Sequence, residues 1–205
     1  CGVFGQRLPV TPRLDALAAD GVAFDEAFTV QPVCGPSRAA FQTGLYPTRT
    51  GCWRNGIALP PAAETLAVRM GALGYQTGYV GKWHLASDRG RNLPPTRPRA
   101  RFERIAVPPE RRGGYRDVWV AADALEHTSG PTSGHVYDED GHRVGLHGYR
   151  VDSLTDMAVE RLDRFDERPF FLFVSFLEPH HQNNRFRTIG PKGWAERFRG
   201  FDRPG

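Results

Sequence analysis

The chain has 205 residues, with 27 lysines and arginines, 23 aspartates and glutamates, and a formal net charge of +4. This length allows one domain with a substantial core. The arginines are scattered without interleaved aromatic residues, so the mild positive charge suits an anionic substrate and argues against nucleic acid as a partner. No apolar run approaches the roughly 20 residues of a membrane span, and residues 1–5 do not resemble a signal peptide. Cytoplasmic and exported locations in a bacterium both remain open.

The first half of the chain alternates between helical and extended patterns. A Thr-Pro start, an apolar face and a glycine stop predict a helix at 11–21, and the residues after it predict a strand at 22–29. Proline suits the first position of a helix and glycine the position just after its end, so a helix is expected at 36–44. The spacing of apolar residues predicts a helix at 64–73, and a short strand follows at 75–80.

The second half becomes regular only toward its end. Residues 86–149 are rich in turn-forming residues, although 117–125 has the pattern of a helix and 136–144 that of a hairpin around an Asp-Gly turn. An amphipathic helix is predicted at 152–165. The continuous apolar run at 170–177 is typical of a central strand that is covered on both faces.

This alternation of helices and strands predicts an α/β fold. We expect a mostly parallel or mixed central sheet with helices on both faces. Such folds place their sites at the carboxyl ends of the strands. Cys34, Lys82 with His84, and His180 should therefore lie near one edge of the sheet, although they come from three separate segments.

Cys34 is the first candidate for chemistry. It lies just ahead of the predicted helix at 36–44, where unpaired N–H groups and the positive end of the helix dipole favour an anion. A lone cysteine is more often a small buried hydrophobic residue, although Arg38 nearby would favour a thiolate. Cysteine phosphatases place their arginine farther along the chain than the four residues found here. Three cysteines without metal-site spacing predict neither a disulfide framework nor a zinc site.

The segment from Cys34 to Gly44 resembles the C-x-P-S-R-x-x-x-x-T-G signature of the type I sulfatases, which belong to the alkaline-phosphatase-like superfamily. The resemblance implies that Cys34 is oxidised to Cα-formylglycine by a formylglycine-generating enzyme. One hydroxyl of the hydrated aldehyde would attack sulfur, and the other would then expel sulfate. Arg38 would hold the diol and the anionic substrate.

A second segment, residues 74–85, is similar to the G-Y-x-T-x-x-x-G-K-W-H-L segment of the same family. Taken alone, Lys82 could be a solvated surface charge and His84 an ordinary loop histidine. With the cysteine motif, the resemblance implies that Lys82 binds a sulfate oxygen and that His84 serves the diol hydroxyl when sulfate leaves. Histidine suits such a task because it exchanges a proton near neutral pH.

A third segment, the apolar run at 170–177 followed by Pro179-His180, looks like the strand and Pro-His element of the family. The resemblance implies that His180 contacts the substrate and protonates or positions the leaving oxygen. His181 is the rival for this role, since it is adjacent in sequence.

The function that this resemblance implies is hydrolysis of a sulfate ester, on a small molecule or a saccharide. Two alternatives stay open at this point. The first is a phosphonate or phosphate monoester hydrolase of the same superfamily, and the second is a non-catalytic relative that keeps the fold as a binding module.

The resemblance also implies a divalent cation, Ca²⁺ or possibly Mg²⁺ or Mn²⁺, bound by hard oxygen ligands. The formylglycine made from Cys34 would be one ligand, and the family's remaining ligands find no match within the 205 residues. We therefore expect an internal part of one sulfatase catalytic domain, which turns over poorly by itself. Within it we expect the nucleophile and lysine-histidine segments at 11–86, a variable insertion at 87–150, and a helix, strand and Glu-Pro-His-His segment at 151–198.

Overall fold

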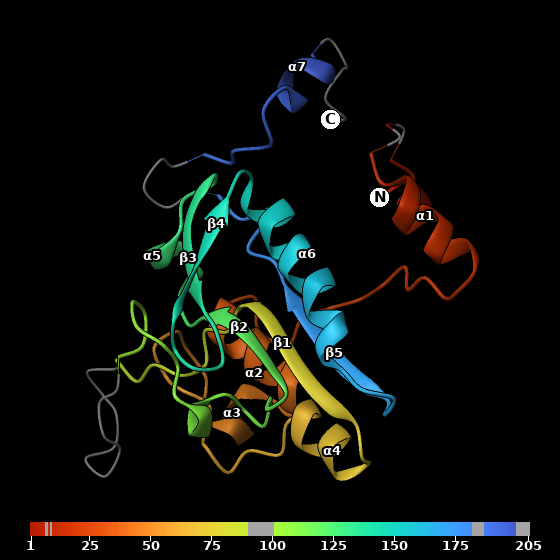
Figure 1. Ribbon diagram of the computed structural model, residues 1–205. Coiled ribbons are helices and arrows are strands. Elements are labelled where there is room, and N and C mark those ends of the chain that lie inside the picture. The colour runs from red at the N-terminus through yellow and green to blue at the C-terminus, as the bar shows by residue number, and fades with distance from the viewer. Residues whose placement is uncertain (7, 9, 90–100, 182–186, 200–205) are drawn as a thin grey trace. The chain divides into compact units, whose positions relative to one another are not determined.

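The computed structural model describes all residues except 7, 9, 90–100, 182–186 and 200–205, and its chain divides into two compact units, residues 1–30 and 31–205 (Figure 1). Part of the predicted insertion therefore lies outside the described residues. That the chain is part of a single catalytic domain stays a prediction.

The N-terminal unit holds a short 3-10 helix η1 (Gly2–Phe4) and the helix α1 (Pro12–Ala19), which confirms the predicted helix at 11–21. Asp15 of α1 accepts a hydrogen bond from the backbone N–H of Val3 at 2.9 Å and so ties the two helices together. The predicted strand at 22–29 is wrong. The described residues of this unit contain no other strand, so the segment has no pairing partner within its own unit and stays irregular.

The second unit is built on a five-stranded mixed sheet, with strand order β4-β3-β2-β1-β5. The strand β1 pairs in parallel with β2 on one side and with β5 on the other, whereas β2, β3 and β4 pair antiparallel in succession. The predicted hairpin is confirmed as β3 and β4. The strands are β1 (Gln76–Lys82), β2 (Val118–Ala122), β3 (Ser133–Tyr137), β4 (Arg143–His147) and β5 (Phe170–Ser175).

Two predictions about these strands are wrong. Residues 118–122, expected to be part of a helix, form β2. This strand is buried along its whole length between β1 and β3, so its sequence lacks the alternation that would mark a half-exposed strand. The apolar run at 170–177 is a strand but not a central one. In the described sheet β5 is the edge strand, and Phe170 is 46% exposed.

Helices cover both faces of the sheet, as predicted (Figure 1). On one face, Ala39 of α2 and Ala67 of α4 pack with Tyr79, Trp83 and Trp119. On the other face, Leu154 and Met157 of α6 pack against Val80 and Val120 of the central strands. The helices of this unit are α2 (Cys34–Thr43), α3 (Pro47–Thr50), α4 (Leu66–Ala72), η2 (Pro109–Arg111), α5 (Leu125–Thr128), α6 (Arg150–Glu160), η3 (Arg161–Arg164) and α7 (Trp194–Arg197).

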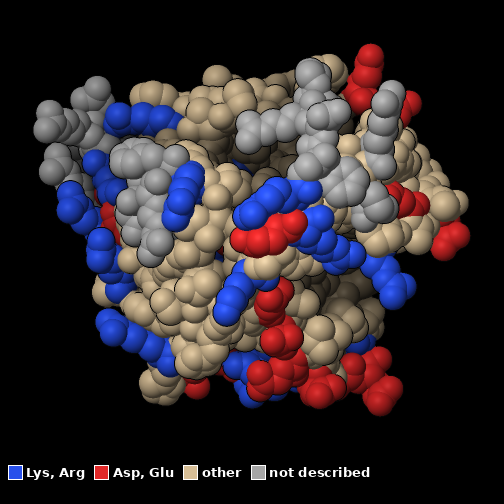
Figure 2. Space-filling view, turned by 90° about the horizontal axis from the view of Figure 1, so that it is seen from above, with Lys and Arg blue, Asp and Glu red and all other residues tan. Residues whose placement is uncertain are grey.

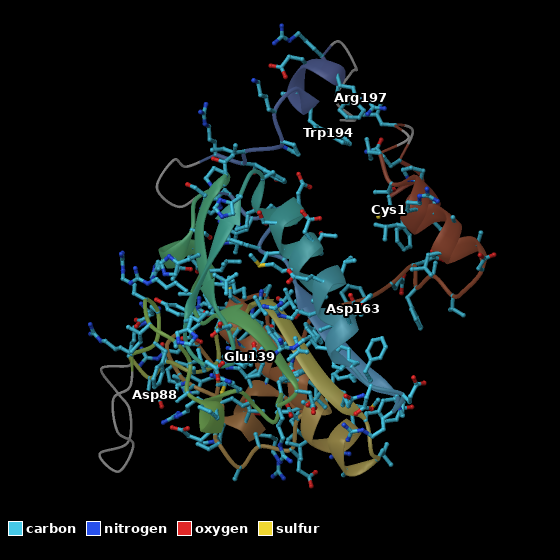
Figure 3. The ribbon with its side chains drawn as sticks, viewed as in Figure 1. Cys1, Asp88, Glu139, Asp163, Trp194 and Arg197 are labelled. Atoms are coloured by element: carbon cyan, nitrogen blue, oxygen red, sulfur yellow. The ribbon has the colours of Figure 1, made fainter. Side chains whose placement is uncertain are left out.

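Side chains fill the space between the sheet and its helices and form these two cores (Figure 3). On the face shown in Figure 2, basic and acidic side chains lie next to each other in several places. Among the described residues, no helix has the length and apolar character needed to cross a membrane.

Candidate active site

Cys34 is the first residue of α2, two residues earlier than the sequence predicted, because the backbone N–H of Ser37 already bonds to the carbonyl of Val33 at 2.9 Å. Gly44 ends the helix in the left-handed conformation, as predicted, with φ 70°. Asn55 accepts a hydrogen bond from the backbone N–H of Gly35 at 2.7 Å and so satisfies one free donor of the first turn. Cys34 thus lies at the positive end of a ten-residue helix.

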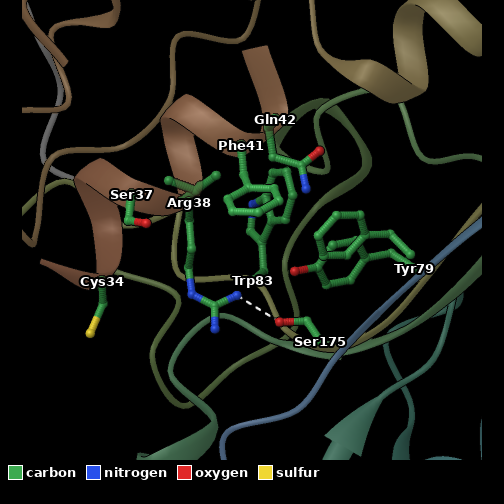
Figure 4. A pocket seen from close by; sticks show the side chains of 10 residues that line it. Cys34, Ser37, Arg38, Phe41, Gln42, Tyr79, Trp83 and Ser175 are labelled. Carbon is green, nitrogen blue, oxygen red and sulfur yellow. Dashed lines mark hydrogen bonds between the residues drawn. The ribbon is translucent and has the colours of Figure 1, made fainter. Parts of the chain in front are cut away.

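A cavity of about 310 Å³ opens beside this helix (Figure 4). Cys34, Ser37 and Arg38 of α2 line one side of it. Tyr79 of β1 and Ser175 at the end of β5 line the other side. The structure therefore brings the cysteine motif to the carboxyl edge of the sheet, where the sequence placed it.

Arg38 connects the helix to the sheet. Its Nη1 donates to the carbonyl oxygen of Lys82 at 2.7 Å and to the hydroxyl of Ser175 at 2.7 Å (Figure 4). The same carbonyl oxygen of Lys82 also accepts a hydrogen bond from the hydroxyl of Tyr79 at 2.6 Å. Burial raises the pKa of Tyr79, so this hydroxyl stays protonated and remains a donor. The guanidinium is thus held one helical turn away from Cys34.

Gly81 explains how β1 and β5 meet at this edge. Its φ is 109°, and a Cβ atom at this position would lie 2.1 Å from the carbonyl oxygen of Ser175. Only glycine combines that backbone conformation with so close an approach of the two strands. The close approach of β1 and β5 therefore explains why the residue before Lys82 is a glycine.

His84 follows the strand in a left-handed conformation, with φ 61°, which is uncommon for a residue with a side chain. The segment around it is held at several points. The backbone N–H of Trp83 donates to Ala122 at 2.9 Å, and that of Ala86 donates to the buried carboxylate of Asp123 at 2.9 Å. The hydroxyl of Ser87 also donates to Asp123. These contacts hold His84 in its unusual backbone conformation.

Lys82 ends β1, and its side chain is only 1% exposed, so it is not a solvated surface charge. Its ammonium nitrogen lies 2.9 Å from Oε1 of Glu126, a residue of α5. Burial alone would raise the pKa of Glu126, but the charge and hydrogen bond of Lys82 outweigh it and hold this pKa at about 2. The carboxylate is therefore ionised at neutral pH.

The imidazole of His84 is neutral at physiological pH. Burial, together with the positive charges of Lys82 and Arg38, lowers its pKa to about 3, although Glu126 acts in the opposite direction. Its Nδ1 atom is buried and has no hydrogen-bond partner in the described part of the chain. Arg38, Lys82 and His84 are thus electrostatically coupled, which joins the two motifs in one site.

His180 is not joined to this group by any hydrogen bond between described residues. Its Nδ1 lies 2.7 Å from the carbonyl oxygen of His181, and the two imidazole rings stack at 4.6 Å. Just before them, Glu178 pairs with the buried guanidinium of Arg150 at 2.6 Å and so anchors the end of the strand segment. The choice between His180 and His181 for the substrate stays a prediction.

Three residues of this site were missed from the sequence. Ser175 is the polar residue that ends an apolar strand, a position at which α/β folds often place functional groups. Glu126 was missed because the strand before it was read as a helix, which hid its place at the same edge. Asn55 gave only a turn signal, and nothing local indicates that its side chain reaches the N–H of Gly35.

The residues do not fit a complete metal site. Among the described residues there is no cluster of three or more His, Cys, Asp or Glu side chains that could hold a cation. Of the ligands that the resemblance implies, the described residues contain Cys34 alone. All three cysteines have free thiols.

The mixed sheet with helices on both faces, and a cysteine at the start of a helix beside its carboxyl edge, define an α/β protein of the alkaline-phosphatase-like class. The family model for sulfatases matches residues 1–204, and the chain belongs to the sulfatase family.

Two relatives show the extent of this similarity. The chain is 37% identical over 173 residues to an ulvan-active sulfatase of Formosa agariphila, a match that covers 83% of this chain and 30% of that protein. The structure of YidJ from Bacteroides fragilis superposes with a TM-score of 0.74 at 26% identity, covering 98% of this chain and 45% of that one.

A third similar structure holds a ligand. It is a complex of BT4656 with its substrate D-glucosamine-2-N,6-O-disulfate, with a TM-score of 0.68 at 25% identity, covering 88% of this chain and 32% of that one. The chain spans only about a third of the length of the curated relatives it matches.

Proposed function

We propose that the complete protein hydrolyses sulfate esters, with Cys34, after oxidation to formylglycine, as the source of the nucleophile. The observation that carries this proposal is the pair of hydrogen bonds from Arg38 to Lys82 and Ser175. They fix a cation one turn along the helix from Cys34 and tie the cysteine motif to the lysine-histidine motif. Family membership supports the same reaction.

The charges of the site suit an anionic ester. A sulfate ester resists attack because its oxygens repel a nucleophile, so a catalyst must stabilise that negative charge. Arg38 and Lys82 supply two fixed cations for this purpose. Because they are held by hydrogen bonds before substrate arrives, they need little reorganisation during the reaction.

The family resemblance assigns His84 the role of a base in this site, and its pKa of about 3 makes it a weak base before the substrate anion binds. A base must be unprotonated at the working pH and close to the proton that it takes. Burial and the neighbouring cations keep its imidazole neutral. The hydrated aldehyde would supply one hydroxyl to attack sulfur and a second to expel sulfate, and His84 would take the proton of the second.

The remaining parts of the mechanism rest on the family. His180, or its rival His181, would protonate or position the leaving oxygen and contact the substrate. A divalent cation, most simply Ca²⁺, would complete the site through ligands that the described residues do not supply. A formylglycine-generating enzyme is the expected partner for the modification of Cys34.

A sulfated saccharide is the substrate class that we propose. The support is a relative of similar fold that was solved with a doubly sulfated amino sugar as its substrate. The site chemistry would also allow attack at phosphorus, so a phosphonate monoester hydrolase is the alternative that the experiment must separate.

The test is made on the complete protein, purified from a host that carries the formylglycine-generating enzyme. We expect mass spectrometry of the peptide containing Cys34 to show an aldehyde in place of the thiol. We also expect turnover of an aryl sulfate to exceed that of the matching aryl phosphonate monoester. Cys34→Ala should abolish turnover, while Cys1→Ser, at an exposed cysteine of the N-terminal unit, should leave it unchanged. An unmodified thiol, or preference for the phosphonate, would contradict the proposal.

A further inference from the structure

Among the described residues, Glu126 is the one hydrogen-bond partner of the Lys82 ammonium, and it lies in neither of the two sequence motifs. The two side chains are 1% and 13% exposed, and their charged atoms are 2.9 Å apart. Glu126 belongs to α5, which begins three residues after β2 ends, so its carboxylate reaches the carboxyl edge of the sheet from the strand next to β1. An ammonium group has three donors, and Glu126 occupies one of them.

Two buried atoms beside this pair lack hydrogen-bond partners in the described residues. They are Oε2 of Glu126 and Nδ1 of His84. Glu126 and His84 also interact electrostatically, because each shifts the pKa of the other. Buried polar atoms without partners cost free energy, and here two of them belong to residues that also interact electrostatically.

Glu126 also sets the charge balance of the site. The charged groups that act on His84 are Lys82 of β1, Arg38 of α2 and Arg89 of the following loop, all cations, together with the carboxylate of Glu126. Among these four groups, Glu126 is the one that carries a negative charge. Breaking a buried ion pair on one side leaves an uncompensated charge, which is strongly unfavourable.

We propose that Glu126 is a positioning residue of the nucleophile site: its carboxylate orients the Lys82 ammonium so that the remaining donors face the sulfate group, and it balances one of the positive charges there. This inference rests on the proposed sulfate ester hydrolysis and adds a residue to it. Glu126 itself does not touch the substrate. Its effect is on the geometry of Lys82 in the transition state.

The proposal predicts a separation between binding and turnover in Glu126→Gln. Glutamine keeps the size and an acceptor oxygen but removes the negative charge from an anion site. Inorganic sulfate, measured by titration calorimetry, should then bind at least as tightly as it does to the unchanged protein. Because Lys82 loses the partner that orients it, kcat should fall at least tenfold.

Two further variants make the test specific. Glu126→Asp keeps the charge on a shorter side chain, so it should return sulfate affinity to the original value and recover part of kcat. Glu139→Gln is the matched control: Glu139 is also a partly buried glutamate in an ion pair, with Arg164, and it also has one unpartnered oxygen. It lies in the loop between β3 and β4 (Figure 3), and its substitution should change neither quantity.

The outcomes separate this inference from the proposed function. A kcat within twofold of the original in Glu126→Gln would overturn the positioning role of Glu126. A parallel loss of sulfate affinity and kcat in Glu126→Gln, without recovery in Glu126→Asp, would also overturn it, because that result indicates a merely structural ion pair. If the complete protein carries the aldehyde but does not hydrolyse sulfate esters, the proposed function fails. The comparison of sulfate affinities among the variants then still decides whether Glu126 controls the charge of an anion site.

Discussion

The guanidinium of Arg38 and the backbone carbonyl of Lys82 are joined by a hydrogen bond of 2.7 Å across 44 residues of sequence. This bond connects the first turns of α2 to the last residue of β1. It uses a main-chain acceptor, so the ammonium of Lys82 is available to pair with Glu126 at 2.9 Å. Lys82 thus contacts Arg38 through its backbone and Glu126 through its side chain.

Arg38→Lys should lower kcat/KM by about 100-fold or more. Lysine cannot reproduce the planar guanidinium that binds Lys82 and Ser175, and hydrogen bonds to charged groups contribute about 1.5–3 kcal/mol each. Steady-state kinetics on the complete protein, after mass spectrometry has shown equal modification of Cys34, measures this effect. Ser175→Ala removes only one of the two acceptors and should cost less. Equal losses in the two variants would contradict this assignment.

Gly81→Ala should destabilise the protein by about 3 kcal/mol or more, because the new Cβ atom would collide with a backbone oxygen and the φ angle at this residue is positive. Urea unfolding measures the change. Gly71→Ala is the control, since Gly71 lies within α4 and a Cβ there would meet nothing within 4 Å. That substitution should leave stability unchanged or raise it by about 0.5–1 kcal/mol.

The buried His84 should make the protein less stable in acid. Its pKa is about 3 in the folded protein against the ordinary value of 6.5, so between these values the unfolded chain binds more protons than the folded one. This contribution to stability is complete above pH 6.5 and is lost as the pH falls toward 3, with a slope of up to about 1.4 kcal/mol per pH unit.

The check compares unfolding free energies across this pH range in the unchanged protein and in His84→Gln. The variant should show a shallower dependence on pH. His127→Gln, at an exposed histidine, should keep the original slope. Identical slopes in all three proteins would show that His84 is not buried in its neutral form.

The ion pair of Arg150 and Glu178 should be costly to break from one side. Arg150 is completely buried and also donates to the carbonyl of Gly130 at 3.1 Å. Arg150→Met leaves the Glu178 carboxylate buried and unpaired, for which we expect a loss of about 3–5 kcal/mol in unfolding free energy. The double variant with Glu178→Leu should recover part of this loss. A double variant less stable than the single one would argue against an unpaired charge as the cause.

The sequence by itself determined the parts of this protein that depend on local chemistry. Pro36 and Gly44 predict α2 because one residue is tolerated in the first turn and the other adopts the left-handed conformation after the last. The apolar segments predict β1 and the amphipathic α6. The spacing of Cys34, Arg38, Lys82 and His84 indicated the family, which the match over residues 1–204 confirms.

Only the tertiary structure decided what depends on neighbours. Residues 118–122 became a strand rather than a helix because β1 and β3 pair with them, whereas 22–29 has no strand within its own unit to pair with. The hydrogen-bond partners of the motif residues could not be predicted from the sequence either. Ser175, Asn55 and Glu126 are distant in sequence from the groups that they contact, and packing of the whole chain, not a local pattern, brings their hydrogen-bonding atoms within reach.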